Sequence, residues 1–139
     1  MRHHLPQVSY QIHTNSELGL MLRGEKPLAV FSDAHGGFPE VVERYLQMFD
    51  RHVELGEFHR REFVEFDQRG MPRLHVILYA LPGEEWRIDE MIALRSRMWS
   101  AGWNEASEQR EGELLGYTPD QMEEWMRTWR ERQDAFRNR

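Results

Sequence analysis

The sequence predicts an α+β fold, in which a small mixed or antiparallel sheet of three or four strands, including one β-hairpin, is packed by helices. Three observations lead to this prediction. Short apolar or alternating segments of strand length lie within the first 81 residues. A loop with Gly and Pro, residues 68–72, joins two of these segments. After Pro82-Gly83 the apolar residues recur at helical spacing, which predicts a C-terminal half of three helices.

The N-terminal half is predicted to alternate strands with helices. Residues 8–13 alternate apolar and polar side chains and favour a first strand, and a short helix follows and ends at Gly24. Residues 28–31 are all apolar, as in a buried strand. Residues 38–53 carry apolar side chains at each helical turn and predict a long helix that ends at Gly56.

Residues 57–67 and 73–81 are predicted to form the hairpin. If their pairing centres on Gly70, Glu65 lies opposite His75. These two side chains would then form either an acid/base pair or a surface ion pair.

Three helices are predicted in the C-terminal half. The first begins at the carboxylates of residues 84–85 and ends at Gly102, and the second covers residues 105–115. The third begins at the segment 118–121, which combines a Thr N-cap, a Pro and a Gln three residues after the cap. Because the sequence shows no internal repeat, residues 1–139 are expected to form a single domain.

The composition of the chain indicates its cellular location and the partners that it does not bind. The chain has 40% apolar residues, no apolar run near the roughly 20 residues of a membrane helix, no signal-peptide pattern at its N-terminus and 0 Cys. We therefore expect a cytoplasmic protein without membrane contact. The net charge of -6 disfavours binding to nucleic acid. Lys26 is the one lysine among 18 basic residues, a bias that we attribute to genomic base composition.

The segment from Phe31 to Gly37, Phe-Ser-Asp-Ala-His-Gly-Gly, directly follows the apolar strand. It resembles the first metal-binding motif of the calcineurin-like metallophosphoesterases, Asp-x-His-Gly at a strand end. The resemblance implies a two-metal centre with Asp33 and His35 as ligands. A metal-dependent hydrolase of phosphoesters, with a divalent metal as cofactor, would add His59 and His75 from the hairpin. The later motifs of that family, Gly-Asp-x-x-Asp, Gly-Asn-His-Glu and Gly-His-x-His, are absent from the sequence.

A turn is the alternative interpretation of the same segment, and it is the one we favour. In a turn Asp33 caps the backbone, His35 is an exposed loop residue, and Gly36 and Gly37 adopt positive φ.

All five Trp residues lie after residue 85, and Trp, Tyr and Met are enriched at protein interfaces. The first hypothesis is therefore a small acidic, non-enzymatic regulatory protein of the inhibitor or immunity type, without a cofactor. It would bind a protein partner, or a second copy of itself as a homodimer, through Trp99, Trp103, Tyr117, Trp125 and Trp129. Alternatively, these rings close the helices onto the sheet. A small-molecule pocket beside Phe63, Ile77 and Tyr79 is a further possibility.

Overall fold

The computed structural model describes residue 13 and residues 16–138 of the 139-residue chain. In these residues the chain forms α2 (Glu17–Leu22), β1 (Leu28–Ala34), α3 (Glu40–Glu54), β2 (His59–Phe66), β3 (Pro72–Ala80), α4 (Trp86–Ala101), α5 (Glu105–Leu115) and α6 (Pro119–Arg137). The predicted α+β class is confirmed, and the sheet is small and antiparallel. The predicted strand over residues 8–13 lies outside the described residues, except for His13.

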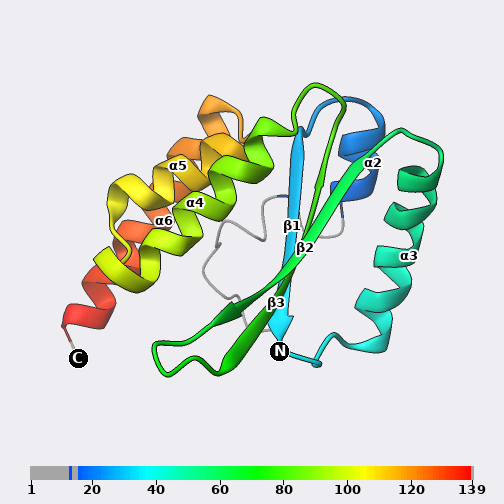
Figure 1. Ribbon diagram of the computed structural model, residues 1–139. Coiled ribbons are helices and arrows are strands. Elements are labelled where there is room, and N and C mark those ends of the chain that lie inside the picture. Colours follow the sequence, from blue (N-terminus) through cyan, green and yellow to red (C-terminus); the bar gives the residue numbers. More distant parts are fainter. Residues whose placement is uncertain (1–12, 14–15, 139) are drawn as a thin grey trace, which may run out of the picture.

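β3 is the central strand of the sheet, and β1 and β2 lie on either side of it (Figure 1). β1 pairs with β3 over its whole length, from Leu28 opposite Ala80 to Ala34 opposite Leu74. The last five residues of β3 are all buried, as a strand with neighbours on both sides and helices on both faces requires. β2 and β3 form the predicted hairpin.

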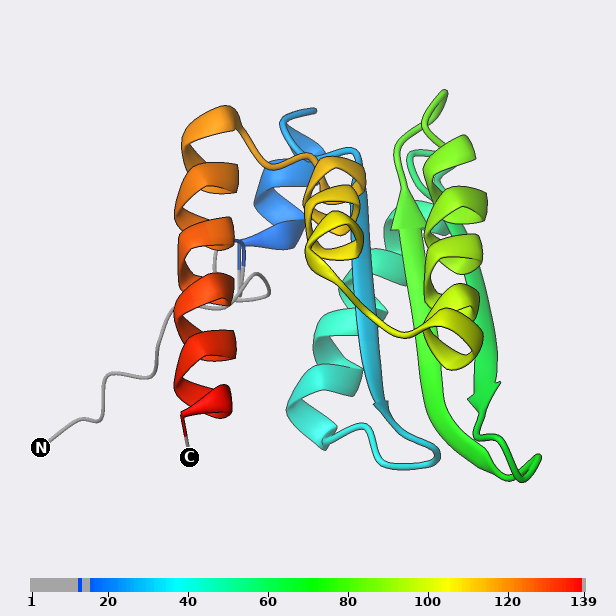
Figure 2. The ribbon, with the colours of Figure 1, turned by 90° about the vertical axis from the view of Figure 1, so that its left-hand side faces the viewer.

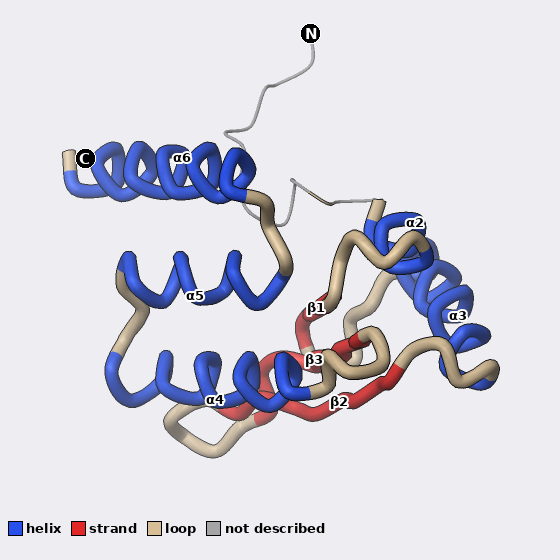
Figure 3. The backbone as a smooth tube through the Cα atoms, turned by 90° about the horizontal axis from the view of Figure 1, so that it is seen from above, coloured by secondary structure: helices blue, strands red, loops and turns tan. Residues whose placement is uncertain are grey.

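Helices cover both faces of the sheet (Figures 2 and 3). α2 and α3 pack on one face, and α4 and α5 pack on the other. α6 packs against α5 and lies farther from the sheet. Within the described part of the chain, no helix is both long and apolar enough to cross a membrane.

The α3 face of the sheet holds a core rich in aromatic rings. The alternation of side chains along β1 and β3 directs Ala29, Ile77 and Tyr79 toward α3. Phe49 of α3 stacks on Tyr79 with 4.7 Å between ring centroids, and both side chains are fully buried. The apolar stripe predicted over residues 38–53 is therefore the buried face of this helix.

The α4 face holds a mainly aliphatic core. It combines side chains of β1 and β3 with side chains of α4 and α5, namely Leu28, Val76, Leu78, Ala80, Ile88, Met91, Leu94 and Leu114. The two cores share β3, whose residues contribute alternately to one and to the other.

The hairpin register differs by one residue from the prediction. Phe66 pairs with Pro72, so the loop is centred one residue before Gly70, and a bulge between Glu65 and Phe66 then places Glu65 opposite Leu74 instead of His75. A shift of one residue moves a side chain to the other face of a sheet, and Glu65 and His75 therefore lie on opposite faces. The predicted Glu65–His75 pair does not form. Glu65 accepts two hydrogen bonds from Arg95 of α4 instead, at 2.8 and 2.9 Å.

The last two helices begin at the caps that the sequence predicts. Asn104 caps α5 by accepting a hydrogen bond from the Ser107 amide. At the start of α6, Thr118 Oγ1 accepts from the Gln121 amide, and Gln121 Oε1 accepts from the Thr118 amide at 2.9 Å. This reciprocal pair satisfies two amides that a helix N-terminus otherwise leaves unbonded.

The loop before β1 packs against the end of α5. Gly116 follows α5 with a φ of +82°, and its Cα lies so close to Pro27 that an added Cβ would be 2.3 Å from Pro27 Cδ. Pro27 also accepts a hydrogen bond from the Leu81 amide at 3.0 Å. These contacts fix the preceding residue, Lys26, beside the carbonyl end of α5.

We expect Gly116→Ala to lower the free energy of unfolding by about 3 kcal/mol, because the methyl group disfavours the left-handed backbone and also collides with Pro27. Gly56→Ala is the matched control, since Gly56 follows α3 with a φ of +76° and has nothing within 4 Å of an added Cβ. The control should lose about 1 kcal/mol. Urea unfolding measures both, and equal losses would contradict the close packing of Gly116 on Pro27.

Candidate functional site

A cavity of about 190 Å³ lies between β1, α4, α5 and the loops that flank α2. An engineered cavity of about 150 Å³ already accepts benzene, so this one has room for a molecule of about that size. Apolar side chains such as Val30 and Met91 line part of the wall. Its ionisable side chains are His13, Glu17, Lys26, Arg95, Glu111 and Tyr117.

Lys26 is the most unusual of these residues, because it is buried with only 2% of its surface exposed. Its Nζ donates a hydrogen bond to the carbonyl oxygen of Leu115, the last residue of α5, at 3.0 Å. The carbonyl end of a helix carries partial negative charge, which favours an ammonium group. The ring of Tyr117 lies near the same group, with its centroid 5.8 Å from Nζ.

His13 is the second hydrogen-bond partner of Lys26, with 2.7 Å between Nδ1 and Nζ. The other ring nitrogen, Nε2, lies 3.3 Å from Gln121 Oε1. That oxygen is an acceptor, so Nε2 carries the proton and Nδ1 presents its lone pair to Lys26. The capping box of α6 thus fixes the tautomer of His13, since it orients the Gln121 amide.

Burial shifts the protonation of both residues. It lowers the pKa of Lys26 from 10.5 to about 7, because the ammonium loses its hydration while both hydrogen-bond partners are neutral; the charge of Glu17 opposes this shift. Burial, and then the positive charge of Lys26, lower the pKa of His13 from 6.5 to about 4. At neutral pH His13 is therefore neutral, and Lys26 is near its midpoint.

The other charges on the cavity wall are unequal in sign. Glu17 and Glu111 contribute two carboxylates. The positive charge of Arg95 is balanced by Glu65, and the two side chains of this ion pair are only 13% and 5% exposed. When Lys26 is neutral, it no longer balances the negative charge of Glu17 on this wall.

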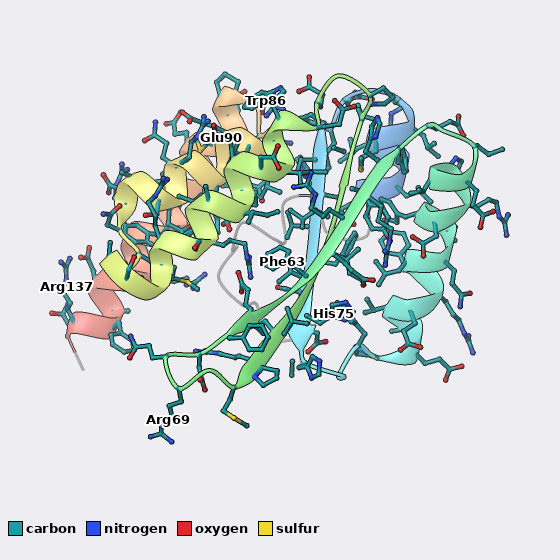
Figure 4. All side chains as sticks on the ribbon, in the orientation of Figure 1. Phe63, Arg69, His75, Trp86, Glu90 and Arg137 are labelled. Carbon is teal, nitrogen blue, oxygen red and sulfur yellow. The ribbon has the colours of Figure 1, made fainter. Side chains whose placement is uncertain are left out.

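Three of the four predicted metal ligands, Asp33, His35 and His75, lie toward the hairpin end of the sheet, and His59 lies toward the other end. Asp33 and His75 lie opposite each other on β1 and β3, toward the hairpin end, where Figure 4 labels His75. His59 lies opposite Ala80, five positions along β3 from His75. That separation is about 17 Å at the spacing of a strand, so Asp33 and His59 cannot share one metal ion.

The two hairpin histidines have carboxylate partners of their own. His59 Nε2 lies 2.6 Å from Glu85 Oε1, and His75 Nε2 lies 2.7 Å from Glu62 Oε2. Across residues 13 and 16–138, no group of three or more His, Asp and Glu side chains could hold a metal ion.

The segment from Phe31 to Gly37 ends in a turn. The carboxylate of Asp33 accepts a hydrogen bond from the adjacent Ala34 amide at 2.7 Å, and His35 is exposed. Gly36 has a φ of +76°, whereas Gly37, which was also expected at positive φ, does not. Asp33 and His35 thus lie where the turn interpretation places them.

The five aromatic residues predicted to bind a partner lie in different environments. Tyr117 and Trp125 are buried, with 9% and 4% exposure, in a small core between α5 and α6. Trp103 and Trp129 are partly exposed. Trp99 is part of α4, and its side chain is outside the described set. Protein binding or homodimer formation through this face stays a prediction.

Trp103 takes part in a second buried polar cluster, outside the cavity. Its indole Nε1 donates to Glu108 Oε1 at 2.5 Å. Burial, and then the charge of Glu111, raise the pKa of Glu108 from 4.5 to about 7. Glu108 Oε2 and Trp125 Nε1 have no hydrogen-bond partner among the described residues.

The predicted pocket beside Phe63, Ile77 and Tyr79 does not form, because these residues are divided between the two faces of the sheet. Ile77 and Tyr79 are buried under α3. Phe63 packs on the other face, where it lines a groove of about 270 Å³ with Phe66 and Ile92 of α4.

Sequence reasoning missed Lys26 and His13 as site residues. The available signal was that Lys26 is the one lysine of the chain. A composition bias accounts for the many arginines, but it does not explain why one lysine remains. The partners of Lys26 come from positions 13 and 115, and no local pattern links them.

We expect the free energy of unfolding to rise between pH 7 and pH 9.5. The pKa of Lys26 is 10.5 in the unfolded chain and about 7 in the folded chain. Between these two values the unfolded chain binds more protons than the folded chain, so stability increases with pH. The contribution of Lys26 is up to about 1.4 kcal/mol per pH unit.

Lys26→Met should show a flatter pH profile and a higher stability at pH 7, by about 1 kcal/mol or more, because a buried ammonium is replaced by an apolar chain. Urea unfolding of both proteins at several pH values tests this. Parallel pH profiles would contradict the burial of a titrating amine.

Comparison of the chain with models of protein families, with curated proteins and with solved structures finds no match, so the candidate site rests on its own geometry.

Proposed function

We propose that this protein binds a small, uncharged, polar molecule in the cavity beside Lys26. One observation carries the proposal. The chain's one lysine is buried on the wall of a cavity with room for a ligand, and both its hydrogen-bond partners are neutral. A buried amine lowers stability unless it is paired with a charge, and such groups are concentrated at functional sites.

A purely structural role accounts poorly for this lysine. The end of α5 already has its own cap, because the amides of Gly116 and Tyr117 donate to carbonyl groups of the last turn. A structural lysine would also be expected to pair with a carboxylate, as Arg95 does with Glu65.

The charges of the wall favour an uncharged ligand. An anion would meet the carboxylate of Glu17, and a cation would meet the Lys26 ammonium. A neutral molecule avoids both and needs no ion desolvation. Lys26 Nζ has three N–H bonds when protonated, of which His13 and Leu115 accept two. The third can donate to an oxygen of the ligand.

Cyclopentanol is a suitable probe, since it is uncharged, close to benzene in size and able to accept one hydrogen bond. We expect saturation transfer from the protein to cyclopentanol by ligand-observed NMR, and a weaker signal from cyclopentanecarboxylate of matched ring size. No transfer to cyclopentanol would contradict the proposal.

Two variants locate the binding. Ser32 lies at the exposed side of the cavity wall, so Ser32→Phe should fill the cavity and abolish the transfer. Ala34→Phe is the matched control, because Ala34 is two residues farther along β1, on the same face, exposed and outside the cavity lining. The control should bind cyclopentanol as the unmodified chain does. An equal loss in both variants would show that binding does not occur in this cavity.

A further inference from the structure

We propose that Lys26 forms a covalent imine with a small uncharged aldehyde or ketone held in this cavity. The inference rests on the proposed function and adds a chemical step to it. Three features of the cavity support it: the protonation of the amine, the position of its lone pair and the charge of the surrounding wall.

The first feature is the availability of the neutral amine, which is the form that attacks a carbonyl group. With a pKa of about 7, about half of the Lys26 side chains are neutral at pH 7. At the ordinary pKa of 10.5 the neutral fraction would be roughly one in three thousand. The folded chain therefore holds about a thousandfold more of the reactive form than the unfolded chain does.

The second feature is the arrangement of hydrogen bonds around Nζ. Neutral Lys26 has two N–H bonds, and two acceptors lie within reach: His13 Nδ1 at 2.7 Å and the Leu115 carbonyl at 3.0 Å. If both N–H bonds are directed to these acceptors, the lone pair takes the remaining tetrahedral position. The hydrogen bonds thus hold the nucleophile in one orientation before a carbonyl compound arrives.

The third feature is the charge of the wall. A neutral amine and a neutral carbonyl compound give a protonated imine, which is a cation. Glu17 on the same wall favours that developing positive charge, while the charge of Arg95 is balanced by Glu65. The same carboxylate disfavours a keto acid, so the predicted substrate class is uncharged.

Imine formation passes through a carbinolamine. The Lys26 lone pair attacks the carbonyl carbon, and the C=O π electrons move to oxygen, which takes up a proton. The nitrogen loses one proton, for which His13 Nδ1 is the nearest base. The carbinolamine then expels its hydroxyl group with a proton, as water, and the nitrogen lone pair forms the C=N bond. Amine, carbonyl compound and one proton thus give the protonated imine and one water.

Reductive trapping tests the inference. The full chain is incubated at pH 7 with cyclopentanone and sodium cyanoborohydride, whose hydride reduces the imine to a stable secondary amine. The chain has one lysine, so the amines that can react are Lys26 and the α-amine of the first residue. Mass spectrometry of arginine-cleaved peptides separates the two. We expect Lys26 to be alkylated at least about tenfold faster in the folded chain than in urea, because burial raises the neutral fraction.

If Lys26 is buried but cannot be reached by the ketone, it is alkylated more slowly in the folded chain than in urea. Alkylation of Lys26 that is no faster in the folded chain than in urea would therefore overturn the inference. Ser32→Phe should reduce the folded rate to the unfolded rate or below it, because the filled cavity covers Lys26, and Ala34→Phe should leave the folded rate unchanged. An unchanged rate in Ser32→Phe would also overturn it.

Cyclopentanol, which has no carbonyl group, separates this inference from the proposed function. If cyclopentanol binds and cyclopentanone does not alkylate Lys26, the imine is contradicted and small-ligand binding stands. If cyclopentanol does not bind and Lys26 is not alkylated, both are contradicted.

Discussion

The arrangement of the cavity depends on the contact between Lys26 and the carbonyl end of α5. This hydrogen bond joins the loop before β1 to the C-terminal helices, and the packing of Gly116 on Pro27 reinforces it. His13 extends the connection to α6 through Gln121. Residues far apart in the sequence thereby form one wall of the cavity. The Lys26 amine on this wall has no ion-pair partner among its hydrogen-bond partners.

Two buried charged groups on the α4 face show different solutions to the same physical problem. Glu65 has a bidentate partner in Arg95, so its charge is balanced inside the protein. Lys26 has only neutral hydrogen-bond partners and borders a cavity, so its charge is partly lost at neutral pH. The first arrangement holds α4 on the hairpin. The second lowers stability, and we explain its presence by ligand binding.

The parts of the fold that follow from near neighbours were predictable. The apolar stripe of α3 and the capping box of Thr118 and Gln121 need only a few adjacent residues, and both are present. The hairpin register was not predictable, because one extra residue at the bulge beside Glu65 changes the face of every residue before it. The site was missed because the partners of Lys26 are distant in sequence. Helical spacing also did not show that Trp125 is buried.

The most direct test of this account is an NMR titration of Lys26 itself. Because the chain contains one lysine, ¹³C-labelled lysine gives one set of side-chain signals without any mutation. We expect the Cε and Hε chemical shifts to titrate with a midpoint near pH 7. A midpoint close to the ordinary value of 10.5 would show a solvated ammonium and would contradict the buried, reactive amine on which the proposed binding and imine formation depend.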